Sequence, residues 1–140
     1  MDKVRLAEYN ALVCEVERLQ EERRNILEAI GDTPPLDGMP KPKLRHADKA
    51  GNAGARLAVL AAMIDEQLDE LVALRVEIEE SLLSLSSSER NLMRLRYIDG
   101  LSWAMVTERI FGYRGDYFDR FESYLRNVTR KHGRILRKIA

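Results

Sequence analysis

The chain has 140 residues, of which 45% are apolar and 33% are charged, with 23 basic and 23 acidic side chains. This length suits one ordinary domain or two small helical modules and argues against a large enzyme with a deep cleft. No apolar run approaches the roughly 20 residues that span a bilayer, and the opening MDKVRLAEYN has no signal-peptide core, so we expect a cytoplasmic protein with no membrane partner.

The zero net charge hides an asymmetry along the chain. Residues 1–85 carry 11 Lys and Arg against 17 Asp and Glu, a net charge of −6, whereas residues 86–140 carry 12 against 6, a net charge of +6. Residues 123–140 hold six cations and no acid. Such a cluster favours a polyanionic partner, because neutralised phosphates release counterions, although a solvated helix face has the same composition.

Two long amphipathic helices are predicted in the acidic part. The first ends near Gly31 and has apolar residues at spacings of three and four: Tyr9, Leu12, Val16, Leu19, Ile26 and Ile30. The second repeats the pattern at Leu57, Ala61, Ile64, Leu68, Leu71, Ile78, Leu82 and Leu85. Because both stripes must leave water, we expect an antiparallel, coiled-coil-like helical hairpin, or pairing with a second copy as a homodimer.

Three residues stand out on these helices. Arg23 and Arg75 interrupt the apolar stripes, and we expect both side chains to extend outward along their own stems. The single cysteine, Cys14, has no partner for an internal disulfide, and we expect a half-buried helical residue there.

Residues 31–55, between the two helices, are predicted to form a loop because they contain all four prolines. Asp48 is predicted to cap the second helix, which would then begin near Lys49. The loop is a plain linker or a contact with DNA or a protein, since it is locally basic. Its basic residues are Lys41, Lys43, Arg45, His46 and Lys49.

The serine-rich segment 81–89 is the predicted boundary between the hairpin domain, 1–85, and a C-terminal domain, 86–140. Ser87 or Ser88 is predicted to cap a helix that runs to Ile98.

Asp99 and Gly100 then end this helix, because glycine readily takes the left-handed conformation of a helix end. Ser102 is predicted to cap a short helix that ends at Gly112. Its inward residues would be Trp103, Val106 and Ile110. Two short helices joined by a tight, glycine-containing turn are typical of a helix-turn-helix.

The last helix is predicted to have one packed face and one cationic face. The packed seam comprises Phe121, Leu125, Val128, His132, Ile135 and Ile139. The predicted DNA-binding residues are Arg126, Asn127, Arg130, Lys131, Arg134, Arg137 and Lys138. Arginine pairs bidentately with guanine and asparagine with adenine, so Arg126, Asn127 and Arg130 are assigned to bases. Lys131, Arg134, Arg137 and Lys138 are assigned to the DNA backbone.

Eight of the nine aromatic residues lie between Tyr97 and Tyr124. Tyr97, Trp103 and Phe111 have the spacing of core residues. The others either stack on unpaired bases or pack within the fold: Tyr113, Tyr117, Phe118, Phe121 and Tyr124.

The string SLSSSERNLMRLRYIDGLSWAMVTERI resembles the region 4-like helix-turn-helix of sigma factors. Together with PLDGMPKPK and DKAGN, it is similar to small bacteriophage and prophage proteins described as sigma-70-like or late-gene transcriptional regulators. The resemblance covers most of residues 30–140. It implies double-stranded DNA binding and transcriptional control alongside the RNA polymerase of a bacterial host cell. About eleven additional residues, near RGDYFDRFESY, precede the recognition helix, and they lengthen the turn or extend that helix at its start.

Two other functions fit the same sequence. One is a small terminase-like subunit that recognises DNA for packaging, and the other is a module that binds RNA polymerase or a sigma factor without touching DNA. We expect no enzyme, cofactor or metal site, because there is no phosphate-binding glycine motif and no His/Cys ligand spacing.

Overall fold

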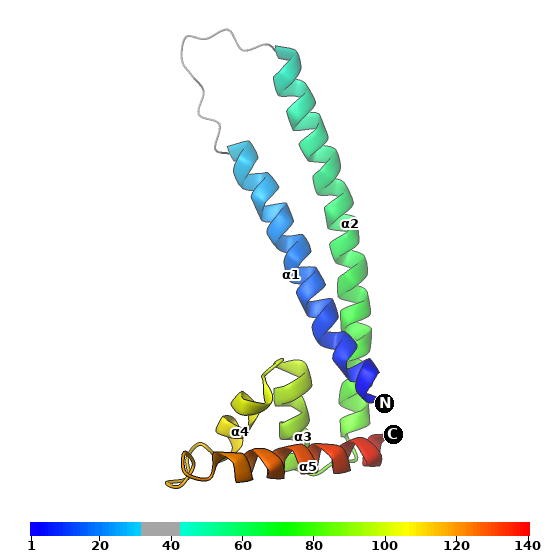
Figure 1. The fold of residues 1–140 in the computed structure, drawn as a ribbon. Coiled ribbons are helices and arrows are strands. Elements are labelled where there is room, and N and C mark those ends of the chain that lie inside the picture. The colour runs from blue at the N-terminus through cyan, green and yellow to red at the C-terminus, as the bar shows by residue number, and fades with distance from the viewer. Residues whose placement is uncertain (32–42) are drawn as a thin grey trace. The chain divides into compact units, whose positions relative to one another are not determined.

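The computed structural model describes the backbone of residues 1–31 and 43–140 and the side chains of residues 1–31 and 51–140 (Figure 1). Every regular element in these ranges is helical, which confirms the all-α prediction. The elements are α1 (Lys3–Gly31), α2 (Lys43–Leu82), α3 (Ser87–Met93), a π-helical turn η1 (Arg94–Ile98), α4 (Trp103–Phe111) and α5 (Phe121–Ile139). None of the helices in the described ranges is both long and apolar enough to cross a membrane.

The start of α2 corrects the predicted loop 31–55. α1 ends at Gly31 as predicted, but α2 begins at Lys43, so Asp48 lies inside the helix rather than capping it. The prolines end at Pro42, and glycines inside a helix cost only about 1 kcal/mol each relative to alanine. Residues 32–42 and the basic side chains up to residue 49, for which a DNA or protein contact was one interpretation, lie outside the described residues.

Contacts group the chain into two compact units. One unit consists of residues 1–11 and 72–140, and the other consists of residues 12–71. The unit of residues 1–11 and 72–140 contains residues from both predicted domains, 1–85 and 86–140.

In the unit of residues 12–71, Leu19 of α1 packs with Leu60 and Ile64 of α2. Ile26 and Leu68 are half-buried against this cluster. Two seam predictions are wrong: Leu60 is buried while Ala61 is exposed, and Ile30 is exposed. Arg23 and Cys14 are also exposed, so Arg23 extends outward as expected and Cys14 does not have the expected partial burial.

In the other unit, every helix contributes buried apolar residues. α3 and α4 both pack against α5, and α4 also packs against η1. The buried residues are Leu6, Tyr9, Leu74, Ile78, Leu82, Leu85, Leu92, Met93, Leu95, Tyr97, Val106, Thr107, Tyr117, Val128, His132, Ile135 and Ile139. Leu6 and Leu74 were absent from the predicted seams. Because the core residues of α5 lie on one side, its opposite side is left at the surface.

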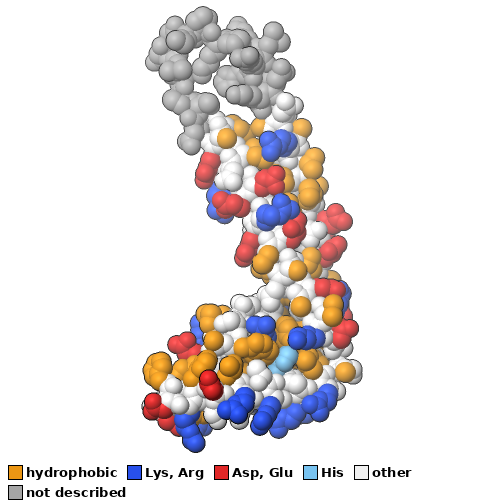
Figure 2. Space-filling view, in the orientation of Figure 1, with side chains coloured by type: hydrophobic (Ala, Val, Ile, Leu, Met, Phe, Trp, Pro, Cys, Tyr) orange, Lys and Arg blue, Asp and Glu red, His pale blue; other side chains and the backbone are white. Residues whose placement is uncertain are grey.

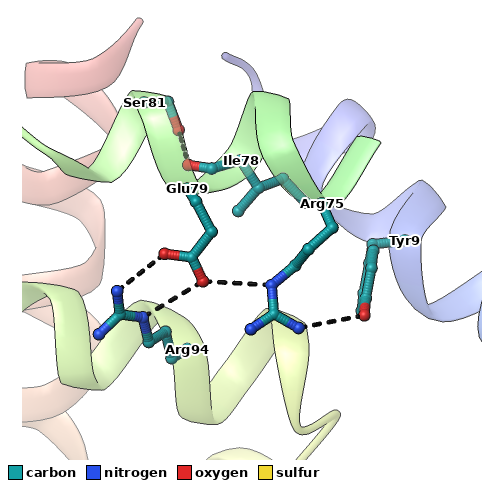
Figure 3. A network of polar contacts seen from close by, with 6 residues as sticks. All are labelled: Tyr9, Arg75, Ile78, Glu79, Ser81 and Arg94. Atoms are coloured by element: carbon teal, nitrogen blue, oxygen red, sulfur yellow. Dashed lines mark hydrogen bonds and ion pairs between the residues drawn. The ribbon is translucent and has the colours of Figure 1, made fainter. Parts of the chain in front are cut away.

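A polar network joins α1, α2 and η1 within this unit (Figure 3). Arg75 of α2 donates to the hydroxyl of Tyr9 at 3.3 Å and to Glu79 at 3.2 Å. Arg94 of η1 donates to the other carboxylate oxygen of Glu79 at 2.8 Å. Arg75 therefore extends away from the apolar seam, as predicted, and its guanidinium ends in a defined set of partners.

Serine caps begin both short helices. The hydroxyl of Ser86 accepts the backbone N–H of Glu89 at 3.3 Å, so the cap of α3 is Ser86 and not the predicted Ser87 or Ser88. Ser86 also donates to the Glu89 carboxylate at 3.0 Å, which adds a reciprocal side-chain contact to the cap. Ser102 caps α4 as predicted, accepting the N–H of Met105 at 3.3 Å.

The turn before α4 starts from a widened helical turn. The helix ends at Ile98 as predicted, but its last five residues form the π-helical η1, in which the N–H of Asp99 donates to the carbonyl of Arg94 at 2.9 Å. Gly100 follows with φ of +70°, the left-handed conformation predicted for it. The N–H of Leu101 then donates back to the carbonyl of Leu95 at 3.1 Å. This turn reverses the chain within three residues, Asp99 to Leu101, before Ser102 starts α4.

Candidate nucleic-acid interface

α5 has one packed face and one surface face. Val128, His132, Ile135 and Ile139 of the predicted seam are buried, and Phe121 and Leu125 are half-buried. The predicted seam of α5 is therefore the face that packs into the core. This packing fixes which side of the helix faces solvent along most of its length.

The predicted DNA-binding residues lie on the other face. Figure 2 shows a row of Lys and Arg side chains along the lower edge of the view, where α5 runs. Six of the seven predicted residues are exposed: Arg126, Asn127, Arg130, Arg134, Arg137 and Lys138. Lys131 is half-buried. A shallow surface hollow is lined by Arg126, Asn127, Arg130, Arg134 and Arg137 together with the smaller Ser123, Thr129 and Gly133.

The guanidinium groups of four arginines in this hollow have no intramolecular partner. Those of Arg126, Arg130, Arg134 and Arg137 form no hydrogen bond or ion pair with any residue that the structure describes. By contrast, Arg18 pairs with Glu15 at 2.6 Å on an equally open helix surface. The four guanidiniums thus keep all of their donors available for a ligand.

Lys131 and Lys138, at the edge of the cationic face, are bound to the start of α3. Lys131 donates to the hydroxyl of Ser88 at 3.0 Å, and Lys138 donates to both carboxylate oxygens of Glu89 at 3.0 Å. The ammonium of Lys138 is the main reason that the pKa of Glu89 lies below its usual value. These two lysines therefore help to hold α5 against α3, and a phosphate would have to replace Ser88 or Glu89 as their partner.

A small polar cluster lies behind the cationic face. His132 is buried, and its Nε2 lies 2.6 Å from the hydroxyl oxygen of Tyr97. The Trp103 ring meets the imidazole edge-on at a centroid distance of 4.6 Å. The guanidinium of Arg96 lies over the Trp103 ring, with its carbon atom 4.6 Å from the ring centroid. The same guanidinium donates to the carbonyl of Leu101 at 2.9 Å. Both aromatic partners of His132, Tyr97 and Trp103, thus come from the segment YIDGLSW, residues 97–103.

The pKa of His132 is lowered to about 4, mainly by burial and to a smaller extent by the nearby positive charges of Lys3 and Arg96. The imidazole is therefore neutral at neutral pH. His132 occupies a packed seam position, as the sequence predicts.

The aromatic residues between α4 and α5 mostly pack on one another. Phe111 stacks on Tyr124 at a centroid distance of 4.7 Å, and Tyr117 meets Phe121 edge-on at 5.8 Å. Tyr124 donates to Asp116 at 2.7 Å, which lowers the pKa of this carboxyl group. The packing interpretation therefore holds for Tyr117, Phe121 and Tyr124, and Phe111, predicted as a core residue, is half-buried against Tyr124.

Two other aromatic residues of this segment remain open to solvent. The side chains of Tyr113 and Phe118 are 79% and 91% exposed, respectively. The additional residues near RGDYFDRFESY both lengthen the turn and extend the last helix. Residues 113–120 form turns, and Phe121–Ser123 form the start of α5.

No group of three or more His, Cys, Asp or Glu side chains in the described part of the chain is arranged to hold a metal ion. No family model, curated protein or solved structure matches the chain. The functional inference therefore rests on the residues of α5 and on the helices that hold them.

Proposed function

We propose that this protein is a sequence-specific DNA-binding regulator of transcription. Its C-terminal helices would act as a sigma region 4-like helix-turn-helix with α5 in the major groove. The observation that carries the proposal is the row of four unpartnered arginines, Arg126, Arg130, Arg134 and Arg137, on the surface face of a helix whose other face is buried. Guanidiniums without internal partners attract a polyanion, because each contact with phosphate releases condensed counterions.

The arginine row runs along a helix, and an α-helix with its side chains is about 10–12 Å in diameter, which fits the width of the major groove. Arg126 and Arg137 are eleven residues apart, which at about 1.5 Å per residue is a span of roughly 16 Å along the helix. The major groove of B-form DNA is about 12 Å wide and admits an α-helix. Asn127 lies on the same face and can pair bidentately with adenine.

We assign different roles to the two ends of the row. Arg126, Asn127 and Arg130 are proposed to contact base edges, and Arg134 and Arg137 the sugar–phosphate backbone. Lys131 and Lys138 are proposed to contact the DNA backbone as well, after their hydrogen bonds to Ser88 and Glu89 have broken. The buried seam of α5 supports this assignment of base and backbone contacts to different residues, because a helix held rigidly by packing presents its side chains at fixed positions.

The long helices α1 and α2 are proposed to contact a partner instead of DNA. Asp65, Glu66, Asp69 and Glu70 of α2 are mostly exposed acids without an internal ion pair. They would repel phosphate, which favours a protein partner for this hairpin. The proposed partners are the RNA polymerase of a bacterial host or a second copy of the chain.

DNA affinity measured across a salt series tests the proposal. Wild-type affinity is expected to fall steeply as salt rises. The double variant Arg126→Ala with Arg130→Ala should lose about 2 kcal/mol or more of specific affinity, since each bidentate base contact contributes about 1–3 kcal/mol. The variant Arg134→Ala with Arg137→Ala should weaken all sequences alike and lower the salt slope by about 2.

The matched control removes the same charge elsewhere. Arg18→Ala with Arg24→Ala removes two exposed arginines of α1 that pair with Glu15 and Glu21. This variant should bind DNA as wild type does. Affinity of the wild type no greater than that of an unrelated acidic protein would contradict the proposal.

A further inference from the structure

Gly133 is one of the residues that line the hollow of α5, and no contact in the described part of the chain requires a glycine there. A Cβ atom built on Gly133 meets no heavy atom within 4 Å, so no neighbouring side chain or backbone excludes a larger residue. Its backbone is helical and its φ is not positive, since Gly100 is the one positive-φ residue in the described part of the chain. Neither packing nor backbone conformation therefore explains this residue.

The surroundings of Gly133 suggest what does explain it. Arg130, Arg134 and Arg137 stand three residues before it and one and four residues after it, without internal partners. One turn earlier, the hydroxyl of Thr129 donates back to the carbonyls of Leu125 and Arg126 at 3.1 Å each, so this side chain lies close to the helix. Gly133 itself is half-buried and adds no side chain over the helix backbone, and it is flanked by these three cations.

We infer that Gly133 is the point at which the sugar–phosphate backbone of bound duplex DNA comes closest to the backbone of α5. This inference rests on the proposed function and specifies the geometry of its complex. Glycine permits such close approach because it has no Cβ atom, whereas any other residue would hold the duplex away from the helix and from the flanking arginines. The ligand, and not the fold, then accounts for the glycine.

A size series at residue 133 tests the inference. Alanine and leucine are both good helix formers, so Gly133→Ala and Gly133→Leu should each raise the melting temperature. Close approach predicts that DNA affinity instead falls with side-chain size, several-fold for alanine and roughly tenfold or more for leucine, which is about 1.4 kcal/mol. The probe is the labelled duplex that the wild-type chain enriches most from a randomised pool, measured at constant salt.

Gly54→Ala is the matched control for helix stabilisation. Like Gly133, Gly54 is a helical glycine with nothing within 4 Å of an added Cβ, and it lies in α2, in the unit of residues 12–71. It should raise stability and leave DNA affinity unchanged.

Two results would overturn the inference while leaving the proposed function intact. One is wild-type affinity in Gly133→Leu. The other is an equal loss in the alanine and leucine variants, which would mean that helix softness, and not space, is what DNA binding needs. If the wild-type chain itself enriches no duplex and shows no salt-dependent binding, then the proposed function fails, and the inference fails with it.

Discussion

The hydroxyl oxygen of Tyr97 and Nε2 of His132 lie 2.6 Å apart in the core, and this hydrogen bond joins η1 to α5. Because burial holds the pKa of His132 at about 4, the pair is uncharged at neutral pH. The same burial raises the pKa of the Tyr97 hydroxyl group, so neither partner ionises near neutrality. The position of α5 therefore depends on a neutral polar contact.

Stability is expected to fall as pH decreases from about 6.5 to about 4, the ordinary and folded-state pKa values of His132. In this window the unfolded chain binds a proton at residue 132 and the folded chain does not, so protonation favours unfolding. The loss from this group is at most about 3.5 kcal/mol, since one pKa unit corresponds to about 1.4 kcal/mol. Denaturant unfolding at a series of pH values measures it.

The control for this pH dependence is His132→Asn, which keeps a polar side chain but cannot titrate. Its stability at neutral pH should be lower, and its stability profile should be flatter between the same two pH values. An unchanged slope in the variant would assign the pH dependence to other groups.

Glu79→Ala is expected to destabilise the protein by about 1 kcal/mol, because one carboxylate pairs with both Arg75 and Arg94 at partly solvated positions. Arg94 is the main cause of the lowered pKa of Glu79, and Arg75 contributes less. Thermal unfolding of Glu80→Ala provides the comparison, since the Glu80 carboxylate is exposed and pairs with no residue that the structure describes. Equal melting temperatures for the two variants would show that the network contributes nothing.

Gly100→Ala is expected to cost about 1–2 kcal/mol, because φ of +70° is unfavourable for a residue with a Cβ atom. The new Cβ would also lie 3.0 Å from the side-chain oxygen of Asn10. Adding Asn10→Ala removes this contact but leaves the backbone cost, so the double variant should recover only part of the loss. Full recovery in chemical denaturation would mean that the backbone conformation is not the cause.

Glu89→Gln is expected to strengthen DNA binding, because Lys138 loses its anionic partner and becomes available to phosphate. Glutamine still offers an oxygen to the Ser86 hydroxyl, so the start of α3 should remain intact. One additional phosphate contact should increase the salt slope by about 1.

Glu122→Gln is the control for Glu89→Gln, because it makes the same charge change on α5 at a residue that has no internal partner. It frees no lysine, so its salt slope should equal that of wild type. If both variants bind alike, the loss of one negative charge explains the gain and the release of Lys138 does not.

Periodicity predicted the helices well and their boundaries less well. The faces of α5 follow from its sequence alone, because apolar and cationic residues alternate at helical spacing, and Val128, His132 and Ile135 are buried as predicted. Leu60 was missed because a seam that places one residue every turn cannot say which of two adjacent apolar positions, Leu60 or Ala61, faces the partner helix. Leu74 was missed because the regular spacing placed the neighbouring Arg75 in the seam.

The start of α2 and the cap of α3 were missed for different reasons. Asp48 is a good capping residue by type, but nothing after Pro42 prevents helix, so the helix begins earlier at Lys43. In the serine run, three neighbouring residues have the same capping ability, and the Glu89 side chain selects Ser86 by pairing with it. Local composition identifies such a boundary only to within a few residues.

The partners of the candidate site could be predicted only in part. The cationic face is visible in the sequence, but the distinction between Lys138, bound to Glu89, and Arg134, without a partner, depends on which residues of α3 lie against α5. The contact between Tyr97 and His132 joins residues 35 positions apart, and no local pattern connects them.

The grouping of residues 1–11 with 72–140 limits how the protein can be dissected. Leu6, at the start of α1, is fully buried in the same unit as α5, and Tyr9 is hydrogen-bonded to Arg75 there. An excised fragment of residues 86–140 would keep every arginine of the cationic row but lose the side chains that α1 and α2 contribute to the interior. The smallest piece able to present that row in its native form is thus discontinuous in sequence, and joining its two stretches would require a new linker.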